Sequence, residues 1–432
     1  MLMKLILPVI LLLCLYMPPA RAEDQASALF VSSLPSVFQI AVVDKRSQEK
    51  EAIGTGFRFE SGKDLPLLGT NYHVISDYTR DPDNYDIQYR TEDGRSGLLE
   101  LVAIDVAHDL AVLTSRDDVF VSQEGLHLSR DPLSKGQNIF AIGNPHDKGM
   151  MVIEGAYGGT ISNNFYTHII FSGASLNPGM SGGPAVNEAG HVVGVNVSIE
   201  ANDINYLVPV SALWGLLERV RKEGFVPKRS SNEWRKMVAG QVLDRQRVGI
   251  EGLLKVAPEM ADLKGLTFPK NLDPSFKCWG GGNKRGKEYN IEDAWIVCHQ
   301  ESDIFLKSGL NTGRIQYGLV YSDGSFVPRL GFDYEYSDGY GSSWLADEKE
   351  EWDMSEFQCE SGFTRHANDD WKTALCTRRN RGYPGLYDVY FSSAILGHAK
   401  QGYYYKASLE GVDRQLAMTF LGHLTEKIRW KK

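Results

Sequence analysis

Short apolar runs, broken by Gly, Asp and Asn, dominate the chain from Val37 to about residue 209. The runs at 37–43, 56–59 and 98–104 have the length and composition of β-strands. Many short strands without a long helical period predict an all-β barrel or sandwich. The segment Pro209–Phe225 departs from this pattern because its apolar residues form one stripe at helical spacing. We expect it to be a helix that packs on the β-structure.

The polar segment Val226–Ser231 interrupts the pattern and marks a domain boundary. Beyond it, the sequence predicts a helical connector over 227–272, with helical character from Asn232 to about Lys264. Residues 273–432 are rich in aromatic residues and glycine and form a third region. We expect that region to be a β-rich (α+β) C-terminal domain.

Two elements can be placed within the C-terminal region. The runs Arg314–Tyr321 and Ser325–Phe332 flank a Ser-Asp-Gly sequence and predict a β-hairpin. Leu416, Phe420 and Leu424 lie four residues apart within Val412–Trp430. This spacing predicts an amphipathic helix that closes the chain.

The first 22 residues have the pattern of a secretory signal peptide. Lys4 precedes an apolar run, Leu5–Leu15, and Ala20-Arg21-Ala22 is a small-x-small cleavage site. Cleavage after Ala22 would release residues 23–432 to the periplasm or outside the cell. The alternative is an uncleaved anchor, but the apolar run is only about half as long as a membrane-spanning helix. No later stretch approaches a membrane span.

Length and charge narrow the function class. A chain of 432 residues has room for two or three domains with their own cores. Its formal net charge is −9, and loss of Lys4 and Arg21 with the signal peptide makes it more negative. An acidic chain argues against nucleic acid or an anionic membrane surface as the main partner.

Four of the five cysteines follow the signal peptide, namely Cys278, Cys298, Cys359 and Cys376. An even number in an exported chain favours two disulfides, for which the sequence allows three connectivities. Pairing sequence neighbours would close short loops, each stabilising the fold by roughly 3 kcal/mol. A zinc site is the alternative, but no Cys-x-x-Cys pair is present.

The strongest chemical signal is the segment Asn177–Pro184, in which Ser181 is flanked by Gly179, Gly182 and Gly183. Glycines allow a sharp turn that exposes the hydroxyl. A serine hydroxyl needs a base to become a nucleophile, and an imidazole oriented by a carboxylate supplies one. His73 and Asp109 each adjoin an apolar strand and are the candidates.

The order His73, Asp109, Ser181 separates this pattern from α/β-hydrolases, in which the histidine comes last and a helix follows the serine. Here Pro184 and the strand-like residues 191–198 follow instead. Asp105 is the nearest rival for the carboxylate role, although it lacks the apolar context of Asp109.

Five motifs follow one another between residues 37 and 225, namely Gly54-Thr-Gly-Phe57, Thr70-Asn-Tyr-His-Val74, Asp109-Leu-Ala-Val-Leu113, Ala141-Ile-Gly-Asn-Pro145 and Gly179-Met-Ser-Gly-Gly-Pro184. By these motifs, residues 37–225 resemble the protease domain of HtrA/Deg-type trypsin-like serine proteases. The resemblance implies a chymotrypsin-like double β-barrel over residues 23–226, with the triad between the two barrels. The fold class is therefore expected to be mainly β. That family usually carries PDZ domains after the protease, and residues 273–432 show no convincing PDZ pattern.

The resemblance also implies roles for other residues. The amides of Gly179 and Ser181 would form the oxyanion hole. The substrate pocket would be lined by Ser175, Asn177, Asn196 and Ser198. Ser175 stands where trypsins place an acid, so small or medium apolar P1 residues are expected rather than Lys or Arg. Met180 replaces the aspartate that pairs with a freed N-terminus, so no activating cut at the N-terminus is expected.

Together these features predict an exported serine endopeptidase that acts through an acyl-enzyme on unfolded or exposed protein segments. No metal or other cofactor is required by this chemistry. Its partners would be protein or peptide substrates, and a homo-oligomer is possible. The alternative is a silent protease scaffold that binds proteins in a chaperone-like manner.

Overall fold

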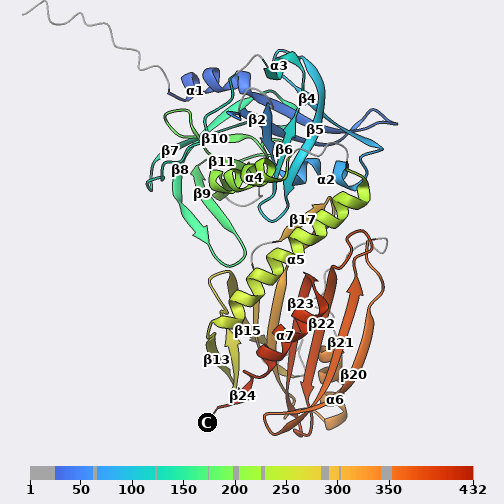
Figure 1. Ribbon diagram of the computed structural model, residues 1–432. Coiled ribbons are helices and arrows are strands. Elements are labelled where there is room, and N and C mark those ends of the chain that lie inside the picture. Colours follow the sequence, from blue (N-terminus) through green and yellow to red (C-terminus); the bar gives the residue numbers. More distant parts are fainter. Residues whose placement is uncertain are drawn as a thin grey trace, which may run out of the picture.

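The computed structural model describes residues 25–61, 66–121, 124–173, 175–197, 204–224, 229–283, 291–300, 303–341 and 353–431. The predicted signal peptide, with Cys14, lies outside the described residues, as do Ser198 and the boundary at residue 226. Two β-barrels form one end of the molecule and a large β-sheet forms the other, with a long helix running between them (Figure 1).

The first barrel is closed and antiparallel, with the strand order β1-β2-β3-β6-β5-β4. Its strands are β1 (Val37–Asp44), β2 (Lys50–Phe59), β3 (Leu67–Thr70), β4 (Tyr85–Arg90), β5 (Ser96–Asp105) and β6 (Leu110–Thr114). The short helix α2 (Tyr72–Arg80) interrupts the strands directly after β3. The predicted strands at 37–43, 56–59 and 98–104 are all confirmed.

The second barrel is also closed, with the order β10-β11-β12-β9-β8-β7. Its strands are β7 (Asn138–Gly143), β8 (Met151–Ser162), β9 (Thr167–Gly173), β10 (Pro184–Val186), β11 (Val192–Val197) and β12 (Ile204–Pro209). The remaining helical segments around the barrels are α1 (Gln25–Ser33), α3 (Asp118–Val121) and two 3₁₀ turns (Leu34–Ser36 and Pro145–Asp147). Two closed six-stranded barrels confirm the expected chymotrypsin-like architecture.

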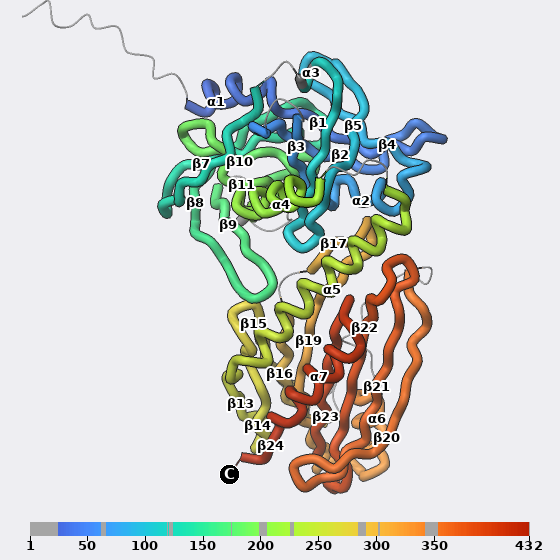
Figure 2. Tube along the Cα trace, in the orientation of Figure 1, coloured from blue at the N-terminus to red at the C-terminus, as the bar shows by residue number. Residues whose placement is uncertain are grey.

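Helix α4 (Val210–Glu223) confirms the helix expected after the second barrel, and its buried residues Leu213, Leu216 and Leu217 belong to a core shared with both barrels. Helix α5 (Ser231–Lys255) then leads away from the barrels toward the C-terminal sheet (Figure 2). Its N-terminus is fixed by a capping box between Ser230 and Glu233.

The helical character expected as far as Lys264 is wrong beyond Lys255. Strands β13 (Glu259–Leu263) and β14 (Leu266–Lys270) form a hairpin and a three-stranded sheet with β24 (Arg429–Trp430). Lys264 and Gly265 both have positive φ, 53° and 99°. A two-residue turn of this kind joins the two strands.

The C-terminal region is built on a seven-stranded antiparallel sheet of order β15-β16-β19-β23-β22-β21-β20. The strands are β15 (Phe276–Asn283), β16 (Glu292–Gln300), β19 (Ile315–Asp323), β20 (Gln358–His366), β21 (Asp369–Arg379), β22 (Tyr387–Ile395) and β23 (Gln401–Val412). A separate hairpin of β17 (Ile304–Lys307) and β18 (Leu310–Thr312) lies near α2. Helix α7 (Arg414–Thr425), within the predicted closing helix, packs on β22 and β23.

The expected hairpin over 314–332 is wrong in its second half. β19 pairs with β16 and β23, and residues 329–341 form helix α6 (Arg329–Gly341) instead of a strand. Asp323 accepts hydrogen bonds from the amide and hydroxyl of Ser325, which turns the chain. Helix α6 begins directly after Pro328, whose carbonyl accepts from the amide of Phe332 at 3.1 Å.

Two disulfides join adjacent strands of this sheet. Cys278 and Cys298 are direct cross-strand partners on β15 and β16, with Cα atoms 4.0 Å apart. Cys359 and Cys376 are partners on β20 and β21, also with Cα atoms 4.0 Å apart. Of the three connectivities that the sequence allows, the structure has the pairing of sequence neighbours.

Candidate active site

His73 and Asp109 come together at one end of the first barrel. His73 lies in the first turn of α2, and Asp109 directly precedes β6. The ring Nδ1 of His73 lies 2.7 Å from Asp109 Oδ2, and the backbone amide of His73 donates to Oδ1 at 2.8 Å. One carboxylate therefore holds both the backbone and the ring of the histidine. When Nδ1–H donates to Asp109, Nε2 keeps its lone pair and can accept a proton.

The residues before His73 hold Asp109 from its other side. The Asn71 side-chain amide and the backbone amide of Tyr72 donate to the Asp109 carbonyl, at 2.8 and 3.2 Å. Asp109 has a φ of 54°, a left-handed conformation that aspartate tolerates better than most residues. Three consecutive residues, 71–73, thus form hydrogen bonds with Asp109. Sequence analysis identified the aspartate but could not detect these contacts.

The pKa of His73 reflects two opposing effects. Burial disfavours the imidazolium and acts to lower the pKa, but the charge of Asp109 and its hydrogen bond favour it. The interactions with Asp109 outweigh burial, so the pKa of His73 lies above its ordinary value. The imidazolium that forms when the ring accepts a proton is therefore stabilised.

The loop that carries Ser181 packs directly against the strands that lead to His73. The amide of Thr55 donates to the Ser181 carbonyl at 2.8 Å. Gly54 lies between that carbonyl and Val74, the residue after the histidine, and a Cβ there would clash with Val74. Gly182 has a φ of 84°, and a Cβ at this position would clash with the Thr70 hydroxyl. The glycines are thus required because the serine loop approaches the His73 segment so closely.

Thr55 and Asn196 anchor the serine loop. The Thr55 hydroxyl accepts from the Asn144 amide at 3.0 Å and donates to the Gly179 carbonyl at 2.7 Å. The side-chain amide of the fully buried Asn196 donates to the Ile142 carbonyl at 2.9 Å. The backbone carbonyl of Asn196 accepts from the Gly182 amide. These bonds fix the loop's backbone, including the segment expected to supply the oxyanion-hole amides of Gly179 and Ser181.

The expected pocket residues occupy different environments. Ser175 and Asn177 are exposed beside the serine loop, whereas the Asn196 side chain faces into the second barrel and supports the loop. Ser198 lies outside the described residues. A pocket role for these residues stays a prediction.

Met180 is fully buried in the core of the second barrel, in one cluster with Leu176, Val193 and Leu207. Its side chain anchors the loop through apolar contacts, in a place where an aspartate would carry an unpaired charge. This burial agrees with the expectation that the loop's order does not depend on an ion pair at residue 180.

Asp105, the rival carboxylate, has other partners. It contacts His108 Nδ1 at 3.1 Å and Arg219 of α4 at 2.7 Å. Burial acts to raise the pKa of Asp105, but His108 and Arg219 outweigh it and hold the pKa at about 2. Asp105 therefore joins the first barrel to α4, and Asp109 is the carboxylate that orients His73.

The C-terminal region contacts the histidine helix directly. The ring of Phe305 on β17 meets the His73 ring edge-on, with centroids 5.7 Å apart. The next residue, Leu306, offers its carbonyl to the hydroxyls of Tyr72 and Tyr383, each at 3.1 Å. The β17–β18 hairpin and the first barrel share one buried apolar cluster. Sequence analysis missed Phe305 because nothing in its local sequence relates it to α2.

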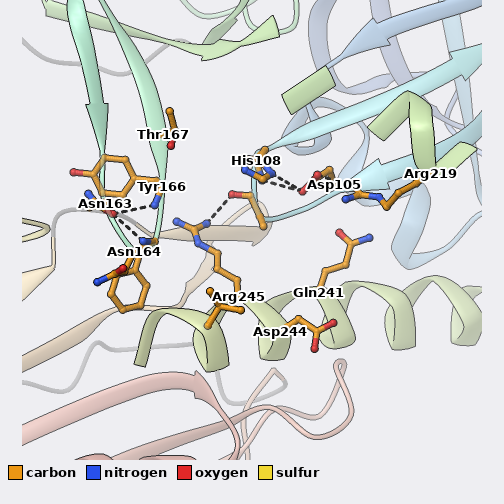
Figure 3. Close-up of a pocket in the computed structure, with 13 residues that line it drawn as sticks. Asp105, His108, Asn163, Asn164, Tyr166, Thr167, Arg219, Gln241, Asp244 and Arg245 are labelled. Atoms are coloured by element: carbon orange, nitrogen blue, oxygen red, sulfur yellow. Dashed lines mark hydrogen bonds and ion pairs between the residues drawn. The ribbon is translucent and has the colours of Figure 1, made fainter. Parts of the chain in front are cut away.

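Helix α5 holds the segment that precedes Asp109 (Figure 3). The Gln241 side chain accepts from the Val106 amide at 2.7 Å and donates to the Ile104 carbonyl at 3.0 Å. One turn later, Arg245 donates to the Ala107 carbonyl at 2.8 Å. These side chains border a pocket of about 380 Å³ between α5, the 105–108 segment and residues 163–167 of the second barrel.

Replacing Phe305 with alanine should raise the pKa of His73 further. Burial is the effect that lowers this pKa, and the Phe305 ring covers part of the imidazole. Following the His73 ring signals by NMR during a pH titration would measure the change. Phe305→Leu keeps an apolar cover and should shift the pKa less. A pKa that moves downward in Phe305→Ala would contradict this account.

Among the described residues, no group of three or more His, Cys, Asp or Glu side chains is arranged to hold a metal ion. Within the same parts of the chain, no helix combines the length and the apolar character needed to cross a membrane.

The barrel region is similar to known proteins. Residues 54–195 match the trypsin-like peptidase domain family. The chain is 28% identical over 255 residues to a probable periplasmic serine endoprotease DegP-like of Halomonas elongata, covering 56% of this chain and 47% of the relative. It is 30% identical over 193 residues to a DegP-like protein of Hahella chejuensis, covering 43% and 39%. The chain thus spans less than half the length of these relatives.

Two further proteins are similar over comparable stretches. The serine protease Do-like HtrA of Bacillus subtilis is 27% identical over 214 residues, covering 46% of each chain. The crystal structure of Deg5 is 26% identical with a TM-score of 0.40, covering 48% of this chain and 98% of that one.

Proposed function

We propose that this chain, which carries a trypsin-like peptidase domain of the HtrA/DegP kind, is a serine endopeptidase with Ser181 as its nucleophile. The observation that carries the proposal is the double hydrogen bond of Asp109 to His73, held beside the anchored serine loop. A serine hydroxyl needs a base to become a nucleophile. The His73–Asp109 pair would supply one, because the hydrogen bond fixes the tautomer in which the other ring nitrogen can accept the hydroxyl proton.

In the proposed reaction, Ser181 Oγ attacks the carbonyl carbon of the scissile peptide bond while its proton passes to His73 Nε2. The amides of Gly179 and Ser181 donate to the oxygen that becomes negative. When the C–N bond breaks, the leaving amine takes the proton from His73 and an acyl-enzyme remains. Water then repeats the sequence: His73 takes its proton, the acyl bond to Ser181 breaks, and the proton returns to the serine.

We also propose that the enzyme is exported and acts on unfolded or exposed protein segments. The relatives from Halomonas elongata and Hahella chejuensis are named periplasmic serine endoproteases. The signal-like sequence of residues 1–22 and the two disulfides support the same location, since disulfides form in oxidising compartments.

The experiment is covalent labelling with a fluorophosphonate probe, which reacts only with an activated serine, combined with cleavage of a denatured protein substrate. The wild-type chain should be labelled and should cleave the substrate, and Ser181→Ala should do neither while keeping the same circular dichroism spectrum. A folded wild-type protein that resists the probe would instead support the second candidate, a silent scaffold that binds proteins.

A further inference from the structure

A pocket of about 520 Å³ lies on the face of the C-terminal sheet that points away from α5 and α7. Those two helices share a buried core with Tyr317 and Tyr405, whose side chains are on the opposite face of the sheet (Figure 1). The pocket residues alternate with that core along the strands, as Val320 of β19 and Tyr404 of β23 show. We call it the Trp279 pocket, and its volume falls within the range of about 300–1,000 Å³ that small-molecule sites occupy.

Strand pairing places two tryptophans of the pocket side by side. Trp279 of β15 lies opposite Val297 of β16, and Gly281 lies opposite Trp295. Side chains two residues apart share a face of the sheet, so the two tryptophans are diagonal neighbours. A Cβ at Gly281 would lie only 2.7 Å from the Trp295 ring, so this ring occupies the space above the glycine. Trp279 is 64% exposed, and its ring is therefore accessible to a ligand.

Two polar side chains line the same pocket. Asn283 of β15 lies opposite Asp293 of β16, on the same face as the two tryptophans. The hydroxyl of Ser322 on β19 donates to Asp293 Oδ1 at 2.6 Å, which holds the carboxylate in place. A carboxylate can accept several hydrogen bonds, and the side chain of Asn283 has both donor and acceptor groups. The pocket thus combines aromatic rings with a fixed acceptor and an amide.

We infer that the Trp279 pocket binds a neutral sugar residue of a glycan, with the sugar ring stacked on Trp279 and its hydroxyl groups bonded to Asp293 and Asn283. A pyranose ring has an apolar face of C–H groups and a rim of hydroxyl groups. The C–H face packs on a flat aromatic surface, because the face of an aromatic ring is its negative side. Each hydroxyl can donate to a carboxylate and accept from an amide, so one small pocket recognises both parts of the sugar.

Other ligands of aromatic surfaces fit this pocket less well. Nucleobases stack on such rings, but the described residues that line the pocket include an Asp and no Lys or Arg to hold the accompanying phosphates. Quaternary ammonium ions bind aromatic cages. The ammonium of Lys406 already lies 5.4 Å from the centre of the Tyr404 ring and would repel a second cation there. A wholly apolar ligand would remove water from Asp293 without replacing its hydrogen bonds.

The test uses the full chain and an array of neutral oligosaccharides built from glucose, galactose, mannose and N-acetylglucosamine. The chain should bind a subset of them, and titration calorimetry with one bound oligosaccharide then gives the Kd. Trp279→Leu should raise this Kd at least tenfold, whereas Trp279→Tyr, which keeps an aromatic ring, should stay within about threefold of the wild type. Asp293→Asn keeps the size of the side chain and should raise the Kd about five- to tenfold, because it removes the charge that strengthens the hydrogen bonds.

Phe363→Leu is the matched control, because Phe363 is a 75% exposed aromatic residue on β20, at the opposite edge of the same sheet. It should leave the Kd unchanged, and both leucine variants should remain folded because the side chains that they replace are exposed. The inference is overturned if no oligosaccharide on the array binds, if Phe363→Leu and Trp279→Leu behave alike, or if choline chloride displaces the bound oligosaccharide. All these measurements can be made on Ser181→Ala, so they do not depend on peptidase activity.

Discussion

Asp109→Asn is expected to lower kcat about 10⁴-fold and leave the fold intact. Asparagine has the size of aspartate and tolerates the left-handed φ of 54° equally well. Its side-chain amide, however, can donate to His73 Nδ1, which places the ring proton on Nε2 and removes the acceptor that Ser181 needs in the proposed mechanism. Hydrolysis of a peptide substrate by the purified variant would measure the loss.

Asp105→Asn is the matched control, because it neutralises a carboxylate four residues away that contacts Arg219 and His108 instead of His73. It should reduce stability and leave kcat within about tenfold of the wild type. If the two variants lost the same fraction of activity, Asp109 would have no special role in orienting the base.

The pH profiles of the same variants give a second readout. In the proposed mechanism His73 acts as a base only when it is neutral, and Asp109 raises its pKa above the ordinary value of 6.5. Wild-type kcat/KM should therefore rise with pH through a midpoint above 6.5. Removing the carboxylate's charge removes the effect that raised the pKa. The residual kcat/KM of Asp109→Asn should therefore still rise with pH, but through a midpoint at lower pH than in the wild type. This direction is opposite to that expected for Phe305→Ala.

Trp234→Ala is expected to lower the free energy of unfolding by about 3–5 kcal/mol. Trp234 is 2% exposed near the start of α5 and belongs to the same buried cluster as Tyr72 of α2 and Leu306 of β17. Truncating it leaves a cavity where the first barrel, α5 and the hairpin meet. Urea unfolding followed by circular dichroism would measure the change.

Val248→Ala is the comparison, since Val248 lies on the same helix but is 62% exposed. It should change the free energy of unfolding by no more than about 0.5 kcal/mol. If the two variants unfolded at the same urea concentration, α5 would not share a core with the barrels.

The parts of the fold that the sequence predicted well are those with a regular period. The barrel strands follow from their short apolar runs, which are buried along most of their length, and α4 follows from its stripe of buried apolar residues. The pairing of His73 with Asp109 followed from motif order, although their contacts with Asn71 and Tyr72 did not. The hydrogen bonds from these residues to the Asp109 carbonyl depend on the left-handed backbone conformation of Asp109. No local sequence pattern reveals that conformation.

The errors share a physical cause. The segment after Lys255 contains residues that suit either a helix or a strand, and the Lys264-Gly265 turn, together with pairing to distant Trp430, made it a strand. At 325–332, where the Ser-Asp-Gly sequence suggested the second strand of a hairpin, helix α6 begins after Pro328 instead. Phe305 and Gln241 lie near the candidate site only because of tertiary contacts. The periodicity of the sequence therefore could not predict their positions there.

Helix α5 has hydrogen bonds to both halves of the molecule within two turns. Gln241 and Arg245 hold the segment before Asp109, whereas Gln246 donates to the carbonyls of Gly313 and Glu410 beside the C-terminal sheet, at 3.0 and 2.9 Å. A helix is stiff over this length, so a tilt of the sheet either moves the aspartate's segment or breaks the bonds of Gln246. The barrels and the C-terminal sheet are therefore coupled through α5, so a change in the position of the sheet would be felt in the segment before Asp109.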